Sequence, residues 1–354
     1  MGKNDYFKKR DILTQKKIMD NLAQLPYFCY EYIAGIESKT SALTRLGYTQ
    51  DLKIFFNYLT KEVNRFVGKS VKQLELSDIA TITSTDLEIY LNYLSSYNGA
   101  LDKTYTNSSI SKARKLSAIR SMLNYFYRKN KLPENVSTKI DSPKIKEKAI
   151  IRLEVDEIVK LLDCAECPEG FTKRQTSYNK ITRKRDIAIL TLMLGTGIRV
   201  SECVGLNIAD IDFEINGFKI TRKGGNQVIL YFSNEVAEAL KDYLEERLNN
   251  KYVTEEETAL FLSIQNKRIG VRAVENLVKK YSHACIPLKK ITPHKLRSTY
   301  GTNLYRQTGD IYIVADVLGH KDVNTTKKHY AAISEDARRS VAGIVKLRED
   351  KEQG

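Results

Sequence analysis

The side chains of this chain that could do chemistry are two arginines, two histidines, a lysine and a tyrosine. In chain order they are Arg199, Lys223, His294, Arg297, His320 and Tyr330. Such a set suits attack on a phosphodiester without a metal ion. Paired guanidiniums bind the non-bridging oxygens and keep their charge. His and Lys can move protons, and a tyrosine hydroxyl can form a covalent phosphate ester.

The charge of the chain favours a nucleic acid as the source of this phosphodiester. Among 354 residues, 58 are Lys or Arg and 43 are Asp or Glu, which gives a net charge of +15. An excess of this size favours a polyanionic partner, either nucleic acid or an anionic membrane surface. No run of about 18 apolar residues is present, so no membrane-spanning helix is predicted. The odd number of cysteines, five, and the absence of a signal peptide indicate a cytoplasmic protein.

Metal, cofactor and redox functions are not favoured. Cys164 and Cys167 form a single Cys-x-x-Cys without a second pair, and we expect them at a helix end. The candidate histidines lie in separate elements, which does not suit a metal site. Asp210 and Asp212 lie near each other but form no carboxylate cluster of the two-metal nuclease kind. We therefore expect neither a metal nor a cofactor.

Residues 1–142 are expected to form a helical domain. Apolar residues recur at helical spacing after Leu52, and a second helix is expected to begin near the caps at Thr83. A third is expected over 108–127, with an apolar face made of Ile110, Ala113, Leu116, Ile119, Leu123 and Phe126. Lys112, Lys115 and Arg120 are predicted to leave that face. They form either a solvated helix surface or a surface that follows DNA phosphates.

The segment 129–150 is the predicted linker, because six lysines alternate there with Pro133 and Pro143. The second domain, 151–354, is expected to be mostly helical. A short helix is predicted over 153–162, a polar loop over 168–182 and a buried helix over 186–195. A β-hairpin with a basic tip at 222–226 is predicted from 217–220 and 227–232. Helices are predicted near 233–248, 270–284, 294–307, 311–318 and 334–347.

Two pairs of candidate residues are spaced by one helical turn. His294 and Arg297 are expected to face the same way, as are Arg199 and Glu202. Arg199 follows Gly195-Thr-Gly197, where the buried helix is expected to end in a turn. Together with Lys223, His320 and Tyr330, these residues supply each part that cleavage of a phosphodiester without a metal needs.

This C-terminal half resembles the catalytic domain of the tyrosine recombinases, the phage-integrase and Xer family. The matching stretches are Gly195-Thr-Gly-Ile-Arg-Val-Ser-Glu202, Lys223-Gly, Thr292-Pro-His-Lys-Leu-Arg-Ser298, Val317-Leu-Gly-His320 and Thr325-Thr-Lys-Lys-His-Tyr330. Residues 111–120 resemble the last helix of the family's core-binding domain. The resemblance implies a mainly α fold, with a helical core-binding domain and a catalytic domain that together clamp DNA.

The resemblance also implies roles for individual residues. Arg199 and Arg297 would hold the scissile phosphate. Tyr330 would attack it, leaving a 3′-phosphotyrosyl link and a free 5′-hydroxyl. Lys223 would protonate the leaving 5′-oxygen, with Lys219 as the alternative lysine. Since each step exchanges one phosphoester for another, neither ATP nor a metal is implied.

The remaining roles complete this expected site. His294 would be the acid or base for the tyrosine, and His320 would bond the phosphate. Glu202 would support an arginine or histidine. Tyr312 precedes His320 and is therefore wrongly placed to be the nucleophile. The predicted DNA contacts outside this site are Arg45, Lys112, Lys115, Arg120, Lys144 and Lys146.

The expected activity is site-specific recombination by a homotetramer on two double-stranded DNA sites, most like Xer resolution of chromosome dimers. The helical pattern begins near Lys16, which leaves little room for an additional arm-binding domain. We expect the segment Ser334–Arg348 to dock on a neighbouring subunit or to form a terminal helix of its own subunit. An accessory DNA translocase or a directionality factor would be further partners, and the protein would be associated with the nucleoid. The alternatives are a mobile-element or phage integrase, a type IB topoisomerase-like enzyme and a non-catalytic DNA-binding protein.

Overall fold

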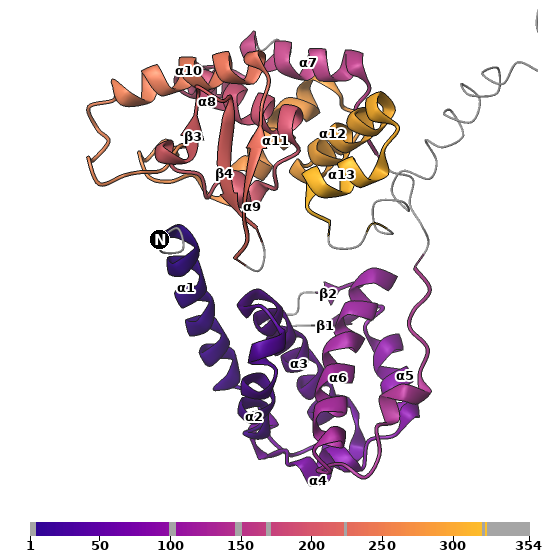
Figure 1. Cartoon of the computed structure of the whole chain (residues 1–354). Coiled ribbons are helices and arrows are strands. Elements are labelled where there is room, and N and C mark those ends of the chain that lie inside the picture. Colours follow the sequence, from indigo (N-terminus) through magenta and orange to yellow (C-terminus); the bar gives the residue numbers. More distant parts are fainter. Residues whose placement is uncertain are drawn as a thin grey trace, which may run out of the picture. The chain divides into compact units, whose positions relative to one another are not determined.

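A computed structural model describes residues 5–98, 104–145, 151–167, 171–222 and 225–320, together with residue 323. The chain divides near residue 148 into two compact units (Figure 1). The N-terminal unit is built mainly from helices. They are α1 (Asp5–Leu22), α2 (Phe28–Gly35), α3 (Ala42–Glu62), α4 (Leu76–Ala80), α5 (Ser84–Tyr93) and α6 (Ser109–Arg128). The first helix thus begins well before Lys16.

A small hairpin interrupts the helices of this unit. Strands β1 (Tyr97–Asn98) and β2 (Thr104–Tyr105) pair antiparallel, with Tyr97 opposite Tyr105. The two rings stack with their centroids 5.6 Å apart. The expectation that this region is helical throughout is therefore wrong at these strands. The cause is a cross-strand aromatic pair, a contact that helical periodicity does not reveal.

The N-terminal core is aromatic at its centre. Phe28 of α2 packs edge to face against Phe56 of α3 and against Phe126 of α6, with centroid separations of 5.8 and 5.6 Å. Of the six side chains on the predicted apolar face of α6, Leu116, Ile119, Leu123 and Phe126 are buried, and Ala113 is partly buried. Ile110 lies in the first turn of α6 and is 54% exposed, so the predicted apolar face begins later.

The predicted linker begins too early. After α6, Leu132 and Ile140 are both buried in the N-terminal core, and the 3₁₀ helix η5 (Val136–Lys139) packs on α6. These two apolar side chains anchor a segment whose composition is otherwise that of a linker. Residues up to about Ile140 therefore belong to the N-terminal unit.

The C-terminal unit is arranged around one long central helix. Its helices are α7 (Val155–Glu166), α8 (Lys173–Thr196), α9 (Val200–Cys203), α10 (Asn234–Leu248), α11 (Val271–Cys285), α12 (Pro293–Thr308) and α13 (Ile311–Leu318). The helix α8 contacts α7, α10, α11 and α12. Its second half is buried, as the apolar run predicted. Cys164 lies in α7 and Cys167 caps its end, as expected.

The predicted polar loop over 168–182 is wrong for most of its length, because α8 begins at Lys173. The polar side chains there have buried partners. Asn179 donates to the hydroxyl of Tyr281, and Thr182 donates to Asp186. Asp186 is 1% exposed and also accepts hydrogen bonds from Lys280 and Tyr281 of α11. A buried charge needs such partners, so these residues join two helices instead of facing solvent.

The predicted hairpin is confirmed and is part of a three-stranded antiparallel sheet. Its strands are β3 (Ile211–Asp212), β4 (Gly217–Thr221) and β5 (Gln227–Tyr231), in that order. Phe218 faces Leu230 across the strands, and its ring lies against that of Phe232. The last ladder pair is Thr221 with Gln227, so the basic tip begins directly after it.

Candidate active site

Arg199 lies at the turn between α8 and α9, as the sequence predicted. α8 ends at Thr196, and Gly197 follows with a φ of 62°. A Cβ atom at position 197 would lie 2.5 Å from Cδ1 of Tyr300, so both the backbone and the packing require glycine. Arg199 is the N-cap residue of α9. The Gly-Thr-Gly segment therefore reverses the chain at the buried end of α8 and places Arg199 directly beyond it.

Glu202 holds Arg199 by two hydrogen bonds. Its Oε1 accepts from Arg199 Nη1 at 2.8 Å, and its Oε2 accepts from the Arg199 backbone N–H at 3.0 Å. Glu202 is 6% exposed, whereas the Arg199 side chain is 34% exposed. A buried carboxylate thus fixes one edge of a guanidinium that remains partly accessible. This contact is the support for an arginine that was expected of Glu202.

Arg297 is buried in α12, with 6% of its surface exposed. Its Nη1 donates to the carbonyl of Gly197 at 2.5 Å, and its Nη2 donates to the carbonyl of Leu318. One guanidinium therefore joins the end of α8 to the end of α13. Because both acceptors are main-chain oxygens, the position of Arg297 depends on the backbone of the two helix ends.

The two arginines meet at the C-terminus of α13. Arg199 Nη2 donates to Leu318 O at 3.1 Å and to Gly319 O at 2.9 Å, and Arg297 also donates to Leu318 O. The last carbonyls of a helix have no partners within the helix and carry its negative dipole end. Cationic side chains that point at them are therefore stabilised. The structure thus brings together two guanidiniums from separate parts of the sequence.

The end of α13 also fixes the backbone of His320. Gly319 has a φ of 60° and a ψ of 48°. The His320 N–H donates to Ala315 O and the Gly319 N–H donates to Asp316 O, which is the Schellman pattern of a helix end. His320 is half-buried directly after this cap. The Leu-Gly-His motif is therefore a helix cap that presents a histidine beside the arginines.

His294 lies in the first turn of α12, one turn before Arg297, as predicted. Its environment differs from that of Arg297, because His294 is exposed and Arg297 is buried. The expectation that these two side chains face the same way is therefore wrong for their surroundings, because one is in contact with solvent and the other is packed inside the unit.

Two of the expected catalytic residues, Lys223 and Tyr330, lie outside the described residues, as does the segment Ser334–Arg348. Lys219, the alternative lysine, is an exposed residue of β4. Tyr312 lies in α13 and is 69% exposed. The roles assigned to these residues stay predictions.

One arginine of this site was not assigned a role from the sequence. Arg222 is half-buried, and its guanidinium donates to the carbonyls of Asp316 and Val317 at 2.9 and 2.6 Å. Burial lowers the pKa of Arg222, Glu202 opposes this effect, and the positive charge of Arg199 adds to it. The only sequence signal was its place in the basic tip of the hairpin. Its acceptors could not be read from the sequence, because they are main-chain atoms of a distant helix.

The predicted DNA contacts of the N-terminal unit have varied surroundings. Arg45 is 6% exposed and donates to Glu37 and to the carbonyl of Thr40. Lys115 is also 6% exposed, so the prediction that it leaves the apolar face is wrong. Its Nζ donates to Asn107, and burial lowers its pKa. DNA binding by these two side chains stays a prediction.

Among the other predicted contacts, Lys112 is partly exposed and donates to Ser95 at 2.6 Å. Lys144 is exposed, and Lys146 lies outside the described residues. DNA binding by these lysines stays a prediction.

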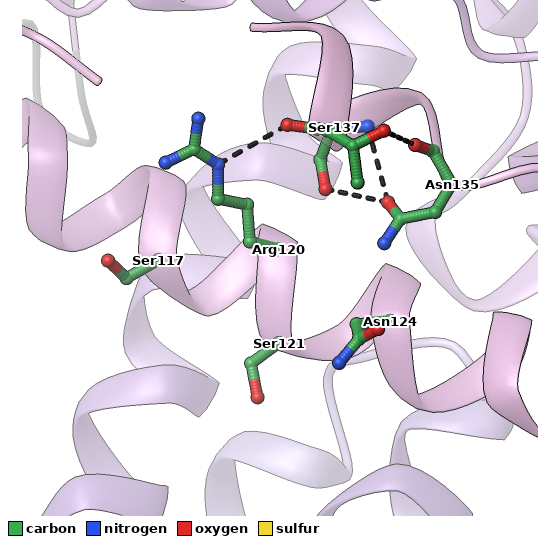
Figure 2. A pocket seen from close by; sticks show the side chains of 7 residues that line it. Ser117, Arg120, Ser121, Asn124, Asn135 and Ser137 are labelled. Carbon is green, nitrogen blue, oxygen red and sulfur yellow. Dashed lines mark hydrogen bonds between the residues drawn. The ribbon is translucent and has the colours of Figure 1, made fainter. Parts of the chain in front are cut away.

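Arg120 borders an open polar depression of about 560 Å³ between α6 and η5 (Figure 2). The lining residues are Ser117, Arg120, Ser121, Asn124, Asn135, Ser137 and Thr138. The guanidinium donates to Ser137 O at 3.3 Å and to Ser142 Oγ at 2.6 Å. Arg120 therefore fastens the segment after α6 to the helix. No residue of the expected phosphodiester chemistry lines this depression.

Within the ranges that the structure describes, no group of three or more His, Cys, Asp or Glu side chains could hold a metal ion. None of the described helices is long and apolar enough to cross a membrane.

The sequence of this chain was compared with models of protein families and with the sequences of known proteins. Residues 152–336 match the model of the phage integrase family. The tyrosine recombinase XerC of Caldanaerobacter subterraneus subsp. tengcongensis is 32% identical over 305 residues, covering 84% of this chain and 79% of the relative. The tyrosine recombinase XerS of Streptococcus pneumoniae is 30% identical over 369 residues, covering 95% of this chain and 100% of the relative.

Solved structures share the fold. A post-cleavage complex of the XerH site-specific recombinase with a palindromic difH substrate has a TM-score of 0.64 at 19% identity, covering 93% of this chain and 89% of that chain. A lambda integrase dimer bound to a COC′ core site has a TM-score of 0.58 at 16% identity, covering 92% of this chain and 80% of that chain. From its matched residues and relatives, the chain belongs to the phage integrase family, the tyrosine recombinases that exchange DNA strands.

Proposed function

We propose that this protein is an Xer-like site-specific recombinase in which Arg199 and Arg297 bind the scissile phosphate and Tyr330 attacks it. The observation that carries the proposal is the convergence of both guanidiniums on Leu318 O, beside the capped turn that bears His320. Guanidiniums keep their charge and suit the oxygens of a phosphodiester. The Arg199 side chain is 34% exposed, so part of its guanidinium remains accessible.

The proposed reaction is balanced as two transesterifications. The Tyr330 hydroxyl attacks phosphorus, and the bond between phosphorus and the 5′-oxygen breaks. Lys223 protonates the 5′-oxygen, while His294 accepts the proton of the tyrosine and His320 bonds the phosphate. The product is a 3′-phosphotyrosyl ester and a free 5′-hydroxyl. A 5′-hydroxyl from the second DNA then attacks this ester and releases the tyrosine. Each step breaks one ester bond at phosphorus and forms another, so no ATP is consumed.

The partners follow from the same chemistry. Exchange between two duplexes needs two cleavable sites and a nucleophile for each strand, which a homotetramer supplies. The similarity to the tyrosine recombinase XerS spans the whole length of that relative, and this supports an Xer-like recombinase. Resolution of chromosome dimers by this single protein is the process that we propose for it. Mobile-element integration would use the same chemistry on other sites. The protein would act in the cytoplasm at the nucleoid, with an accessory DNA translocase or directionality factor.

A covalent trap tests this function. The full chain is incubated with EDTA and a library of nicked duplexes, and adducts are separated on denaturing gels. An adduct from the wild type that Tyr330→Phe fails to form supports the proposal. The matched control is Tyr312→Phe, which removes an exposed tyrosine hydroxyl upstream of His320 and is expected to keep the adduct.

The remaining outcomes separate the alternatives. Relaxation of any supercoiled plasmid by a monomer would indicate topoisomerase chemistry instead. A second library is made from the chromosome of the organism that encodes this protein. Tight binding to this DNA without any adduct would indicate a binding protein and overturn the proposal.

A further inference from the structure

Arg222 connects two parts of the C-terminal unit that are distant in the sequence. Its backbone lies directly after β4, and its guanidinium reaches the end of α13. Nη1 donates to Asp316 O and Nη2 donates to Val317 O. These carbonyls precede those of Leu318 and Gly319, which Arg199 and Arg297 bind. Three arginines therefore occupy four successive carbonyls of one helix end.

Gly319 is the residue that lets Arg222 come so close. A Cβ atom at position 319 would lie 2.4 Å from Arg222 Nη1 and 2.5 Å from its Cζ. The Nε atom of Arg222 is buried and has no hydrogen-bond partner in the described part of the chain. A buried donor without a partner reduces stability. Arg222 therefore stabilises the fold less than an arginine with all its donors bonded would. This favours a role in holding the hairpin in position.

The backbone at Arg222 closes the turn of the hairpin. The Arg222 N–H donates to Asn226 O at 2.8 Å, and the Gly225 N–H donates to Arg222 O at 3.0 Å. The next residue in the sequence is Lys223, the proposed acid. Arg222, whose side chain is bonded to the end of α13, is therefore the residue directly before this lysine in the chain.

We infer that Arg222 is a positioning residue that holds the start of the hairpin turn on the capped end of α13, so that the lysine next to it can protonate the leaving 5′-oxygen. This inference rests on the proposed function. The role assigned to Arg222 is to position the hairpin turn, because its guanidinium bonds the carbonyls of Asp316 and Val317, while binding of the phosphate is already assigned to Arg199 and Arg297 under the proposed function.

The test uses two DNA substrates that differ in one atom. The first has the ordinary 5′-oxygen at the cleavage site, and the second has a bridging 5′-sulfur. A thiol has a pKa of about 8.5, far below that of an alcohol, so the sulfur can leave as a thiolate without a proton. The bond broken is then phosphorus–sulfur, and the products are the phosphotyrosyl ester and a 5′-thiolate. A variant that is slow only because it fails to protonate the leaving group should therefore cleave this substrate at the wild-type rate.

The expected results separate the roles of the residues. With the oxygen substrate, Lys223→Met is expected to slow adduct formation by about 100-fold or more, the usual contribution of general acid catalysis. Arg222→Met is expected to slow it by about 10-fold or more, because a displaced catalytic group loses much of its effect. With the sulfur substrate, both variants should cleave at nearly the rate of the wild type. Arg297→Lys should stay slow on both.

Two variants keep this test independent of folding. Arg222→Lys retains a charge but lacks the planar fork that bonds the two carbonyls from separate nitrogens, and its defect on the oxygen substrate should again be corrected by sulfur. Arg272→Met removes an arginine whose side chain is 82% exposed and should match the wild type on both substrates. Correction by sulfur also shows that the variant protein is folded and binds DNA.

Two outcomes overturn the inference while leaving the proposed function in place. One is an Arg222→Met protein that cleaves the oxygen substrate at the wild-type rate. The other is an Arg222→Met protein that is slow on both substrates, which would make Arg222 a phosphate ligand or a purely structural residue. If the wild type forms an adduct with neither substrate, the proposed function fails, and the inference fails with it.

Discussion

Arg199 and Arg297 donate hydrogen bonds to the same atom, the carbonyl oxygen of Leu318 at the end of α13. One arginine comes from the turn after α8 and the other from the first turns of α12. Their convergence is therefore a property of the packing of three helices. It also places two positive charges together, and the Glu202 carboxylate bonds Arg199.

This shared contact predicts different consequences for the two arginines. Arg297→Lys should reduce adduct formation by about 100-fold or more, as expected for loss of a preorganised charge at the reacting phosphate. It should also lower the free energy of unfolding by about 1–3 kcal/mol, because buried carbonyls lose their donors. Arg199→Lys should cause a similar loss of cleavage with a smaller loss of stability, since Arg199 is partly exposed. Adduct kinetics and urea unfolding of the full chain measure both effects. Unchanged cleavage in both variants would place the phosphate elsewhere.

Glu202 is predicted to act through Arg199. Glu202→Gln keeps the size of the side chain but weakens the hydrogen bond to Nη1, because a charge-assisted bond becomes neutral. The adduct should form about 10-fold more slowly, consistent with loss of a supporting hydrogen bond. The measurement is the cleavage rate at saturating DNA, together with DNA affinity. Arg199→Ala should remove the effect of Glu202→Gln in the double variant, and additive losses would contradict this account.

Gly319 and Gly309 form a matched pair for a test of the contact with Arg222. Both follow helix ends with positive φ, 60° and 66° respectively. A Cβ atom at Gly309 would meet nothing within 4 Å, whereas one at Gly319 would collide with the Arg222 guanidinium. Either alanine should cost about 1–2 kcal/mol of stability through the left-handed backbone. Only Gly319→Ala should also slow cleavage. Equal cleavage by the two variants would show that this close approach has no catalytic consequence.

Glu154 predicts a pH-dependent part of the stability. It joins the start of α7 to Arg306 at the end of α12 and also bonds Arg152. The hydrogen bond from Arg306 lowers the pKa of Glu154 below its ordinary value. The ionised form is thus favoured in the folded state. Its contribution is complete above the unfolded pKa of about 4.3 and is lost as the pH falls through the lower folded pKa.

Glu154→Gln should therefore be less stable than the wild type by about 0.5 kcal/mol at pH 7, a small value because the ion pair is half exposed. The difference should shrink to zero at pH values below the folded pKa, where the wild type is also neutral. Thermal unfolding of both proteins between pH 3 and pH 7 (roughly the titration range of carboxylates) measures this. A constant difference over the range would indicate that charge has no part in it.

DNA binding is predicted to depend steeply on salt. With a net charge of +15, lysines and arginines should displace cations from the DNA backbone. The logarithm of the affinity should fall linearly with the logarithm of the salt concentration, with a slope of about −0.9 for each phosphate neutralised. Fluorescence anisotropy with a duplex measures it, and an affinity that is flat between low and moderate salt would contradict the prediction.

Local patterns were sufficient to predict much of the fold. The helices α10–α13 and the β4–β5 hairpin lie where periodicity, caps and turn residues predicted them, because these signals act within a few residues. The wrong predictions have a common cause. Asn179 and Thr182 belong to the first half of a helix that looked like a polar loop, and Lys115 looked exposed. Their hydrogen-bond partners come from distant elements or from side chains that a local pattern does not identify.

The sequence by itself was enough to predict the chemistry of the candidate site, because residue types and the spacing of five motifs are local properties. It identified Arg199, His294, Arg297 and His320 without any knowledge of their contacts. Only the tertiary structure decided that two of these guanidiniums meet at Leu318 O and that Arg222 is bonded beside them. The physical reason is that the acceptors are main-chain carbonyls. Every residue has one, so nothing in the sequence marks which of them will lie at an unpaired helix end within reach of an arginine.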